Sequence, residues 1–155
     1  MTPAPAVFPH AERDGPCGYE VKNWGFTGFA PGGEKGLWVS GVRSIDAALV
    51  LAESAIDALR YAAMHPDDGV RYASFGGTMN PNQPALIRAA IKRLAPGATV
   101  RIATDNDVDG AGFAAVIEGV VAETGRGDMA VERAAPVGAK DWNDVLRRCR
   151  ESIGV

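Results

Sequence analysis

The sequence predicts an α/β fold: a Rossmann-like, mainly parallel sheet of about four strands with helices on both faces. Two observations lead to this prediction. Residues 48–52 form a short, uninterrupted apolar run, which is typical of a strand buried on both faces of a parallel sheet. After this run, further apolar runs alternate with segments whose apolar residues recur at helical spacing. Such alternation indicates βαβ crossovers and therefore parallel strands.

The chain before this run has a different character. Residues 1–16 hold four of the ten prolines and show no periodicity, so we expect a flexible tail there. Residues 17–44 combine short apolar stretches with many glycines, which predicts a β-rich, hairpin-like lead-in. The α/β domain is then expected over residues 45–155.

Within residues 45–155 the elements follow one another without long gaps. Ser54 can cap a first helix that runs to about His65, and Pro96-Gly97 ends a second helix that begins near Asn82. The remaining predicted elements are strands at 70–75, 99–103 and 129–131, a helix from about Gly110, and a last helix over 142–150.

Composition and charge exclude several classes of protein. With 155 residues, 46% hydrophobic and 23% charged, the chain is long enough for one globular domain. A net charge of −3 argues against a strongly basic nucleic-acid binder, and no apolar run approaches the roughly 20 residues that span a membrane. Two cysteines without a CxxC pair make a disulfide scaffold or structural zinc site unexpected, so we expect a cytoplasmic setting.

Chemically active residues follow each predicted strand. Glu53 follows the first strand, Asp105 and Asp107 follow the third, and the fourth leads through a loop to Lys140-Asp141-Trp142-Asn143-Asp144. The second strand ends in the turn Gly76-Gly77-Thr78, whose N–H groups could bind phosphate. Parallel strands place all these residues at one edge of the sheet, where ligands bind. Crowded carboxylates repel one another unless a cation lies between them, and oxygen ligands suit Mg²⁺ or Mn²⁺.

Each feature also has an ordinary structural interpretation. A lone Asp-x-Asp is more often a turn or helix cap, and Asp109 is more readily a capping or surface residue than a ligand. An EF-hand is excluded because Val116 stands where its last ligand, a glutamate, is required. A P-loop is absent. The functional interpretation depends on the combination and order of the strand-end residues.

In that combination the sequence resembles the Toprim domain of bacterial primases, topoisomerases and related nucleases, over roughly residues 47–150. The resemblance implies that Glu53 is the general acid/base or a metal ligand and that Asp105 and Asp107 bind Mg²⁺. It also implies that Asp144 or Asp141 supports a further metal. One departure is that Val108 and Asp109 separate the Asp-x-Asp from Gly110, whereas bacterial primases place this glycine closer.

The lead-in narrows the resemblance to primase-type Toprim domains of plasmid-encoded primase and relaxase-like proteins. The implied function is Mg²⁺- or Mn²⁺-dependent nucleotidyl transfer in a DNA primase-like protein of a plasmid or mobile element. Single-stranded DNA and nucleotides would be its substrates, Lys140 would contact phosphate, and helicase or relaxase domains of a parent protein would be its partners. A Toprim nuclease, or a non-catalytic metal- and DNA-binding module of a larger DNA-processing protein, remains an alternative.

Overall fold

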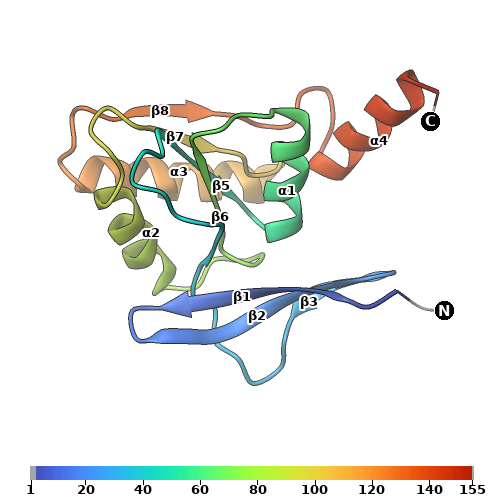
Figure 1. Cartoon of the computed structure of the whole chain (residues 1–155), viewed down its shortest axis with the longest axis horizontal. Helices are drawn as coiled ribbons and strands as arrows, with labels where there is room; N and C mark the ends of the chain where they lie inside the picture. Colours follow the sequence, from blue (N-terminus) through green and yellow to red (C-terminus); the bar gives the residue numbers. More distant parts are fainter. Residues whose placement is uncertain (1–2, 155) are drawn as a thin grey trace.

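A computed structural model describes residues 3–154 and contains two sheets (Figure 1). The larger sheet has five strands in the order β4-β6-β5-β7-β8. Its strands are β4 (Trp38–Val39), β5 (Ala48–Ala52), β6 (Val70–Ser74), β7 (Thr99–Ile102) and β8 (Ala130–Arg133). Only β4 runs antiparallel to its neighbour, β6. The predicted fold class is therefore confirmed, with one antiparallel edge strand more than the four parallel strands expected.

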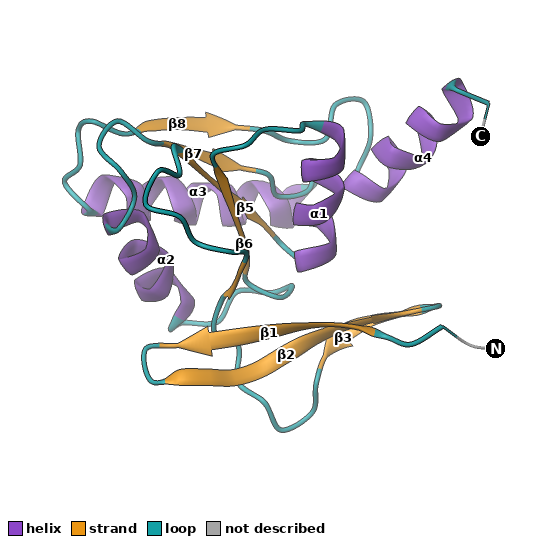
Figure 2. Ribbon diagram, in the orientation of Figure 1, coloured by secondary structure: helices purple, strands orange, loops and turns teal. Residues whose placement is uncertain are grey.

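Two pairs of helices cover the two faces of this sheet (Figure 2). Helices α1 (Ala55–Met64) and α4 (Trp142–Ser152) pack together, as do α2 (Gln83–Lys92) and α3 (Val108–Glu123). All five residues of β5 are buried, and they alternate between the two cores: Leu49 and Leu51 face α2 and α3, whereas Ala48 and Val50 face α1 and α4. Burial on both faces explains why the sequence of this strand is uniformly apolar.

Capping residues set where the helices begin. The side chain of Ser54 accepts a hydrogen bond from the N–H of Asp57, as its predicted capping role requires. Asn82 precedes α2 without a capping bond from its own side chain, and Oδ1 of Asn80 accepts from the N–H of Gln83 instead. Helix α3 begins two residues before the predicted Gly110, because Asp107 caps it by accepting from the N–H of Gly110. The cap brings the second carboxylate of the Asp-x-Asp into the first turn of α3.

A separate antiparallel sheet precedes the α/β part. It consists of β1 (Ala6–Glu12), β2 (Gly15–Asn23) and β3 (Phe26–Phe29), in that order. The prediction of a flexible tail over residues 1–16 is wrong for most of that segment, since it forms β1 and the start of β2; residues 1 and 2 lie outside the described residues. Residues 6–29 thus form a three-stranded lead-in sheet, which begins earlier than the hairpin-like lead-in predicted over residues 17–44. Backbone bonds between Ala11 and Leu37 connect it to the approach to β4.

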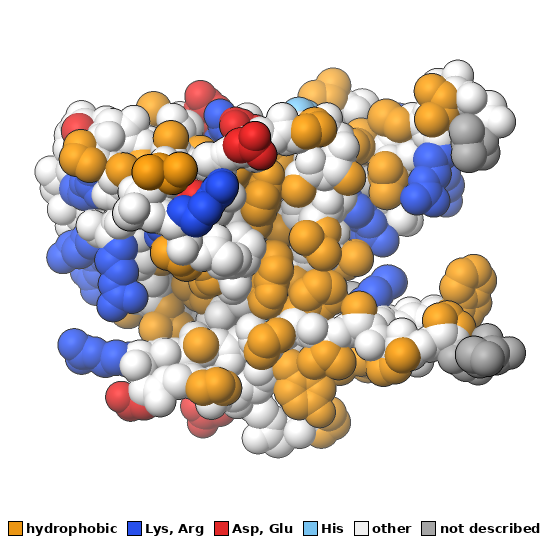
Figure 3. All heavy atoms as spheres, viewed as in Figure 1, with side chains coloured by type: hydrophobic (Ala, Val, Ile, Leu, Met, Phe, Trp, Pro, Cys, Tyr) orange, Lys and Arg blue, Asp and Glu red, His pale blue; other side chains and the backbone are white. Residues whose placement is uncertain are grey.

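Apolar and basic side chains are unevenly distributed over the surface of the molecule. Apolar side chains are exposed over the antiparallel sheet, including Val7, Trp24 and Phe26, while basic side chains gather over α2 (Figure 3). Among residues 3–154, no helix has the length and apolar character needed to cross a membrane.

Candidate metal and phosphate site

The carboxyl ends of three adjacent parallel strands bring the predicted site residues to one edge of the sheet. In the register of the sheet, Ala52 at the end of β5 pairs with Ser74 on β6, and Leu51 pairs with Ile102 on β7. Glu53, the turn at Gly76 and Asp105 follow these strands, as the sequence predicted. Neighbouring strand ends are about 5 Å apart, so these turns contact one another directly.

Glu53 and Asp105 meet through a backbone contact. The carboxylate atom Oε1 of Glu53 accepts a hydrogen bond of 3.1 Å from the N–H of Asp105. The Oδ1 atom of Asp105 is buried and has no hydrogen-bond partner, a condition shared by no other buried side-chain polar atom of residues 3–154. Leaving a buried carboxylate oxygen unpaired costs free energy. A ligand from outside the chain that binds this oxygen would remove that cost.

Burial and like charge act together on these two carboxyl groups. Burial, followed by repulsion from Glu53 and from Asp57, Asp141 and Asp107, raises the pKa of Asp105 to about 7. Burial is also the main cause that raises the pKa of Glu53, and repulsion from Asp107 adds to it. Both shifts mean that the folded chain disfavours the ionised pair unless positive charge is supplied.

Arg133, at the end of the edge strand β8, holds the Asp105 turn from the other side. Its guanidinium donates to the carbonyl oxygens of Ile102 (2.8 Å), Thr104 (2.9 Å) and Asp105 (2.9 Å). Partial desolvation of the guanidinium, in a residue that is exposed as a whole, lowers the pKa of Arg133, and the nearby charges of Glu53 and Asp105 partly oppose this shift. Sequence reasoning missed this residue, because every residue of β8 is exposed and its sequence carries no periodic signal.

Asp107 is divided between two contacts. Its Oδ1 atom accepts from the N–H of Gly110 at 2.8 Å, and its Oδ2 atom lies 4.0 Å from Nζ of Lys140. The structural interpretation of Asp107 as a helix cap is therefore correct for one oxygen, while the other faces the predicted phosphate-binding lysine. Lys140 is exposed, and its carbonyl oxygen accepts from the N–H of Asn106 at 2.7 Å.

Gly110 allows α3 to approach the Asp105 turn. A Cβ atom at Gly110 would lie 1.9 Å from the carbonyl oxygen of Asp105, a distance that no side chain tolerates. The hydroxyl of Thr104 donates to the carbonyl oxygen of Gly110 at 2.7 Å and closes the same contact. The two residues between the Asp-x-Asp and this glycine thus form the first turn of α3, with Gly110 against Asp105.

In the glycine turn after β6, the N–H of Gly77 does not have the phosphate-binding role that the sequence predicted for this turn. Gly76 and Gly77 have φ angles of 75° and 92°, which favour glycine. The N–H of Gly77 donates to the carbonyl oxygen of Glu53 at 2.7 Å, so this amide links two turns and is not directed at a phosphate. The carbonyl oxygen of Thr78 accepts from Nζ of Lys35 at 3.0 Å, which places a second lysine beside the turn.

The last predicted segment divides its two carboxylates. Asp141 caps α4 by accepting from the N–H of Asp144 at 2.8 Å, and it lies close enough to raise the pKa of Asp105. The carboxylate of Asp144 pairs with Arg147 on the same helix. Of the two, Asp141 has the stronger electrostatic connection to the site. Trp142, between them, is buried and donates to the carbonyl oxygen of Ala103.

The sequence of the chain also matches a known protein family. Residues 50–146, more than half of the chain, match the family model described as Toprim-like. The chain belongs to the Toprim-like family. No curated protein sequence matches it.

Two solved structures share the fold of this Toprim chain at low sequence identity. One is the primase fragment of the bacteriophage T7 primase-helicase protein (TM-score 0.53, 16% identity), which covers 95% of this chain; the chain spans 61% of that fragment. The other is a bacteriophage T7 lagging-strand DNA polymerase interacting with primase domains bound to an RNA/DNA hybrid and dTTP (TM-score 0.50, 14% identity). That alignment covers 97% of this chain and 76% of the matched chain in the T7 structure. Because both alignments extend over nearly the whole chain, the similarity includes the lead-in sheet.

Toprim domains generally bind a divalent metal such as Mg²⁺, and the residues present fit one. The unpaired Oδ1 of Asp105 beside the carboxylate of Glu53 offers the hard oxygen donors that Mg²⁺ prefers. Within residues 3–154, however, no three His, Cys, Asp or Glu side chains form a group ready to hold a metal ion. A site with one or two protein carboxylates is typical of Mg²⁺, which takes its other ligands from water and substrate phosphates.

Proposed function

We propose that this Toprim domain carries out divalent-metal-dependent phosphoryl transfer on nucleic acid, as the nucleotidyltransferase part of a DNA primase-like protein. The observation that carries the proposal is the pair formed by Glu53 and Asp105. It joins a buried carboxylate oxygen without a partner to a second carboxylate at the ligand-binding edge of a parallel sheet.

In this proposal Glu53 and Asp105 hold Mg²⁺ or Mn²⁺, and Asp107 contributes through the oxygen that faces Lys140. When bound, the ion stabilises the charge that develops on phosphoryl oxygens. Glu53 also suits general acid/base chemistry, because burial raises its pKa toward the operating range of such a group. Two lysines supply positive charge for phosphates: Lys140, which lies beside Asp107, and Lys35, which lies beside the glycine turn at Thr78.

Two further observations support nucleic acid as the substrate. One structural neighbour is a primase fragment, and the other contains primase domains bound to an RNA/DNA hybrid and dTTP. By analogy we propose single-stranded DNA and nucleotides as ligands, and a helicase or relaxase domain in the parent protein of a plasmid or mobile element. The T7 primase fragment comes from a primase-helicase protein.

The test is incubation of the chain with single-stranded DNA, nucleotides and Mg²⁺ or Mn²⁺, scored for both primer synthesis and strand cleavage. Primer synthesis supports the proposal. Cleavage alone indicates the Toprim nuclease. In primer synthesis the 3′-hydroxyl of a nucleotide is the nucleophile, whereas in a nuclease the nucleophile is water. Metal binding with neither activity indicates the non-catalytic module.

Matched variants make the result specific to the site. Glu53→Gln and Asp105→Asn keep the shape of each side chain and remove its charge, and we expect each to abolish the activity. Asp68→Asn removes a charge from an exposed residue at the opposite edge of the sheet and should leave the activity unchanged. Equal activity in all three variants would contradict the assignment of the site.

A further inference from the structure

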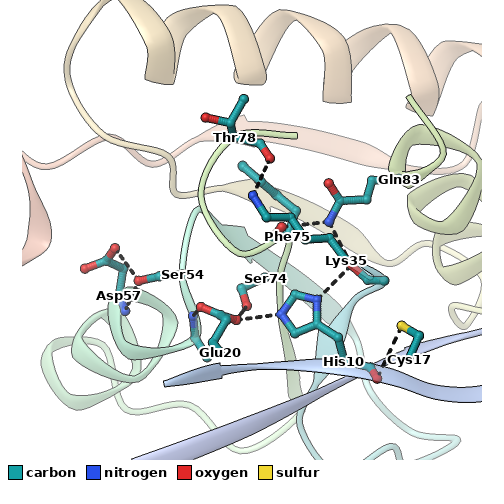
Figure 4. Close-up of polar contacts among 12 residues, drawn as sticks. His10, Cys17, Glu20, Lys35, Ser54, Asp57, Ser74, Phe75, Thr78 and Gln83 are labelled. Carbon is teal, nitrogen blue, oxygen red and sulfur yellow. Dashed lines mark hydrogen bonds and ion pairs between the residues drawn. The ribbon is translucent and has the colours of Figure 1, made fainter. Parts of the chain in front are cut away.

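A buried polar cluster lies where the antiparallel sheet meets the parallel sheet (Figure 4). Its central members are His10 on β1, Glu20 on β2 and Ser74 at the end of β6, and their exposed fractions are 0%, 6% and 0%. A histidine and a glutamate this deeply buried are unusual, and they persist only where every polar atom finds a partner.

Glu20 reaches out of its own sheet to bind the turns of the other. Its Oε1 atom accepts from the N–H of Ala55, the first residue of α1, at 2.9 Å. Its Oε2 atom accepts from the hydroxyl of Ser74 at 2.6 Å and lies 2.8 Å from Nε2 of His10. The carboxylate therefore caps α1 from outside, where the helix dipole favours negative charge, and also holds the last residue of β6.

His10 aligns this carboxylate. Its Nδ1 atom lies 3.0 Å from the carbonyl oxygen of Gly36, and its Nε2 atom faces Glu20. The carbonyl oxygen of Gly36 can only accept, so Nδ1 donates, and the ring is anchored at both nitrogens. Gln83 donates to the same carbonyl and to that of Phe75, which extends the cluster to the start of α2.

The cluster touches both turns that form the candidate site. Ala55 is two residues after Glu53, and Ser74 is two residues before Gly76. The ring of His10 packs against Gly76, where an added Cβ atom would lie 3.0 Å from its Cε1 atom. Gly77 in turn donates to the carbonyl oxygen of Glu53. Two paths thus lead from Glu20 to Glu53, one through α1 and one through the glycine turn.

We infer that Glu20, aligned by His10, is a positioning residue for Glu53: from the antiparallel sheet it fixes the β5–α1 turn and the glycine turn that together hold the Glu53 carboxylate. The lead-in sheet is then part of the active-site machinery. The inference rests on the proposed function only in that it treats Glu53 as an active-site group.

The test separates positioning from stability with a matched pair of variants in the full chain. Glu20→Met and Asp46→Leu each replace a buried, hydrogen-bonded carboxylate with an apolar side chain of similar length. Asp46 precedes β5, at the edge of the sheet opposite the site, where it pairs with Arg71 and Arg43. Glu20→Gln keeps an oxygen that can accept from Ala55 and serves as the conservative variant.

The first measurement, amide hydrogen exchange, does not depend on activity. We expect the Ala55 and Gly77 amides to exchange about tenfold faster or more in Glu20→Met relative to the Val100 amide of the core, a factor matching the loss of a hydrogen bond to a charged group. In Asp46→Leu these two amides should follow the global stability, and Glu20→Gln should restore most of their protection. Unchanged relative exchange in Glu20→Met would overturn the inference.

The second measurement is the metal-dependent activity, compared at temperatures where all variants are folded. We expect Glu20→Met to lower kcat by about 10- to 100-fold with KM little changed, the effect of a misplaced catalytic group, with partial rescue in Glu20→Gln. A loss of equal size in Asp46→Leu would show that Glu20 acts through stability alone and would refute positioning. If the parent chain has no activity, the proposed function fails, and the exchange measurement alone decides the inference.

Discussion

Asp105 is the residue on which the candidate site depends. The fold buries its Oδ1 atom without a partner and surrounds it with the charges of Glu53, Asp57, Asp141 and Asp107. Such an arrangement is unfavourable by itself, and residues retained in unfavourable positions are expected at functional sites. Binding of a metal should relieve this unfavourable arrangement, and the effect should therefore be measurable as an increase in the free energy of unfolding.

We expect Asp105→Asn to be as stable as the parent, or more stable, in the presence of a chelator, because it removes a repelling charge and keeps the shape. Mg²⁺ or Mn²⁺ should raise the Tm of the parent with the logarithm of free metal concentration, and the variant should lose most of this rise. Thermal unfolding followed across a metal titration measures both effects. Equal metal-induced shifts in the two proteins would remove Asp105 from the site.

Asp46 provides the opposite case, a buried carboxylate that is fully paired. Burial alone would raise its pKa, but the N–H of Arg43 and the guanidinium of Arg71 outweigh burial and lower the pKa below its usual value of 3.8. Because the pKa is lower in the folded chain than in the unfolded one, the stabilisation is fully present above pH 3.8 and is lost as pH falls through the folded pKa.

We therefore expect Asp46→Asn to lower the free energy of unfolding by about 3 kcal/mol at pH 7, the cost of leaving a buried arginine without its partner. The difference from the parent should be constant between pH 7 and pH 5 and should shrink below pH 3.8. Urea unfolding at a series of pH values measures it. A difference that grows toward acid pH would contradict the assigned direction of the pKa shift.

Sequence reasoning placed the candidate site residues that follow strands and missed Arg133, which contacts them from the neighbouring strand. Glu53 and Asp105 were predictable because an apolar strand and parallel pairing dictate where the next residue lies. Arg133 was not, because its guanidinium reaches three carbonyl oxygens of another strand. Asp107 was predicted as a ligand, whereas one of its oxygens caps α3.

At the scale of single elements, the start of α3 has the strictest local requirement. Gly110 and Gly112 lie in the same helix, but only Gly110 packs against the Asp105 backbone; a Cβ atom at Gly112 would meet nothing within 4 Å. The two positions provide a direct comparison between close packing and helix propensity.

We expect Gly110→Ala to destabilise the fold by about 1–3 kcal/mol, because the new methyl group must displace the Asp105 turn. Gly112→Ala should stabilise it by up to about 1 kcal/mol through helix propensity. Chemical denaturation of both variants measures the two effects. Because the displaced turn carries Asp105, Gly110→Ala should also weaken metal binding, and retention of full metal affinity would argue against the described contact.

Predictability also differed between elements for a physical reason. Strand β5 is buried on both faces, so its sequence alone identifies it. Strand β1 buries only His10, and its single proline, Pro9, and its exposed residues give no alternation of apolar side chains. Its strand character comes from pairing with β2 and from the hydrogen bond between His10 and Glu20, and no apolar pattern within β1 itself reveals either contact. Only the three-dimensional structure could show that a Pro-rich segment forms a strand.

At the scale of the whole molecule, the charge distribution limits how nucleic acid can bind. The net charge is −3, and the acidic residues concentrate at the proposed site, so few phosphates can be neutralised by the chain alone. We therefore expect weak, salt-sensitive binding that depends on the divalent metal. Lys140 is the exposed cation nearest Asp107, and it should make one of these few phosphate contacts.

Replacement of Lys140 by Gln should weaken binding of single-stranded DNA and reduce the slope of log affinity against log salt concentration by about 0.7, the value for one lost phosphate contact on a single strand. Lys92→Gln, in the last turn of α2, makes the same change in net charge away from the site and serves as the control. Fluorescence anisotropy over a range of salt concentrations, with Mg²⁺ held constant, measures both slopes. If binding depends on net charge alone, the two variants will change it equally. A reduction confined to Lys140→Gln would instead place the nucleic-acid backbone at the edge of the sheet where Asp105 and Asp107 lie.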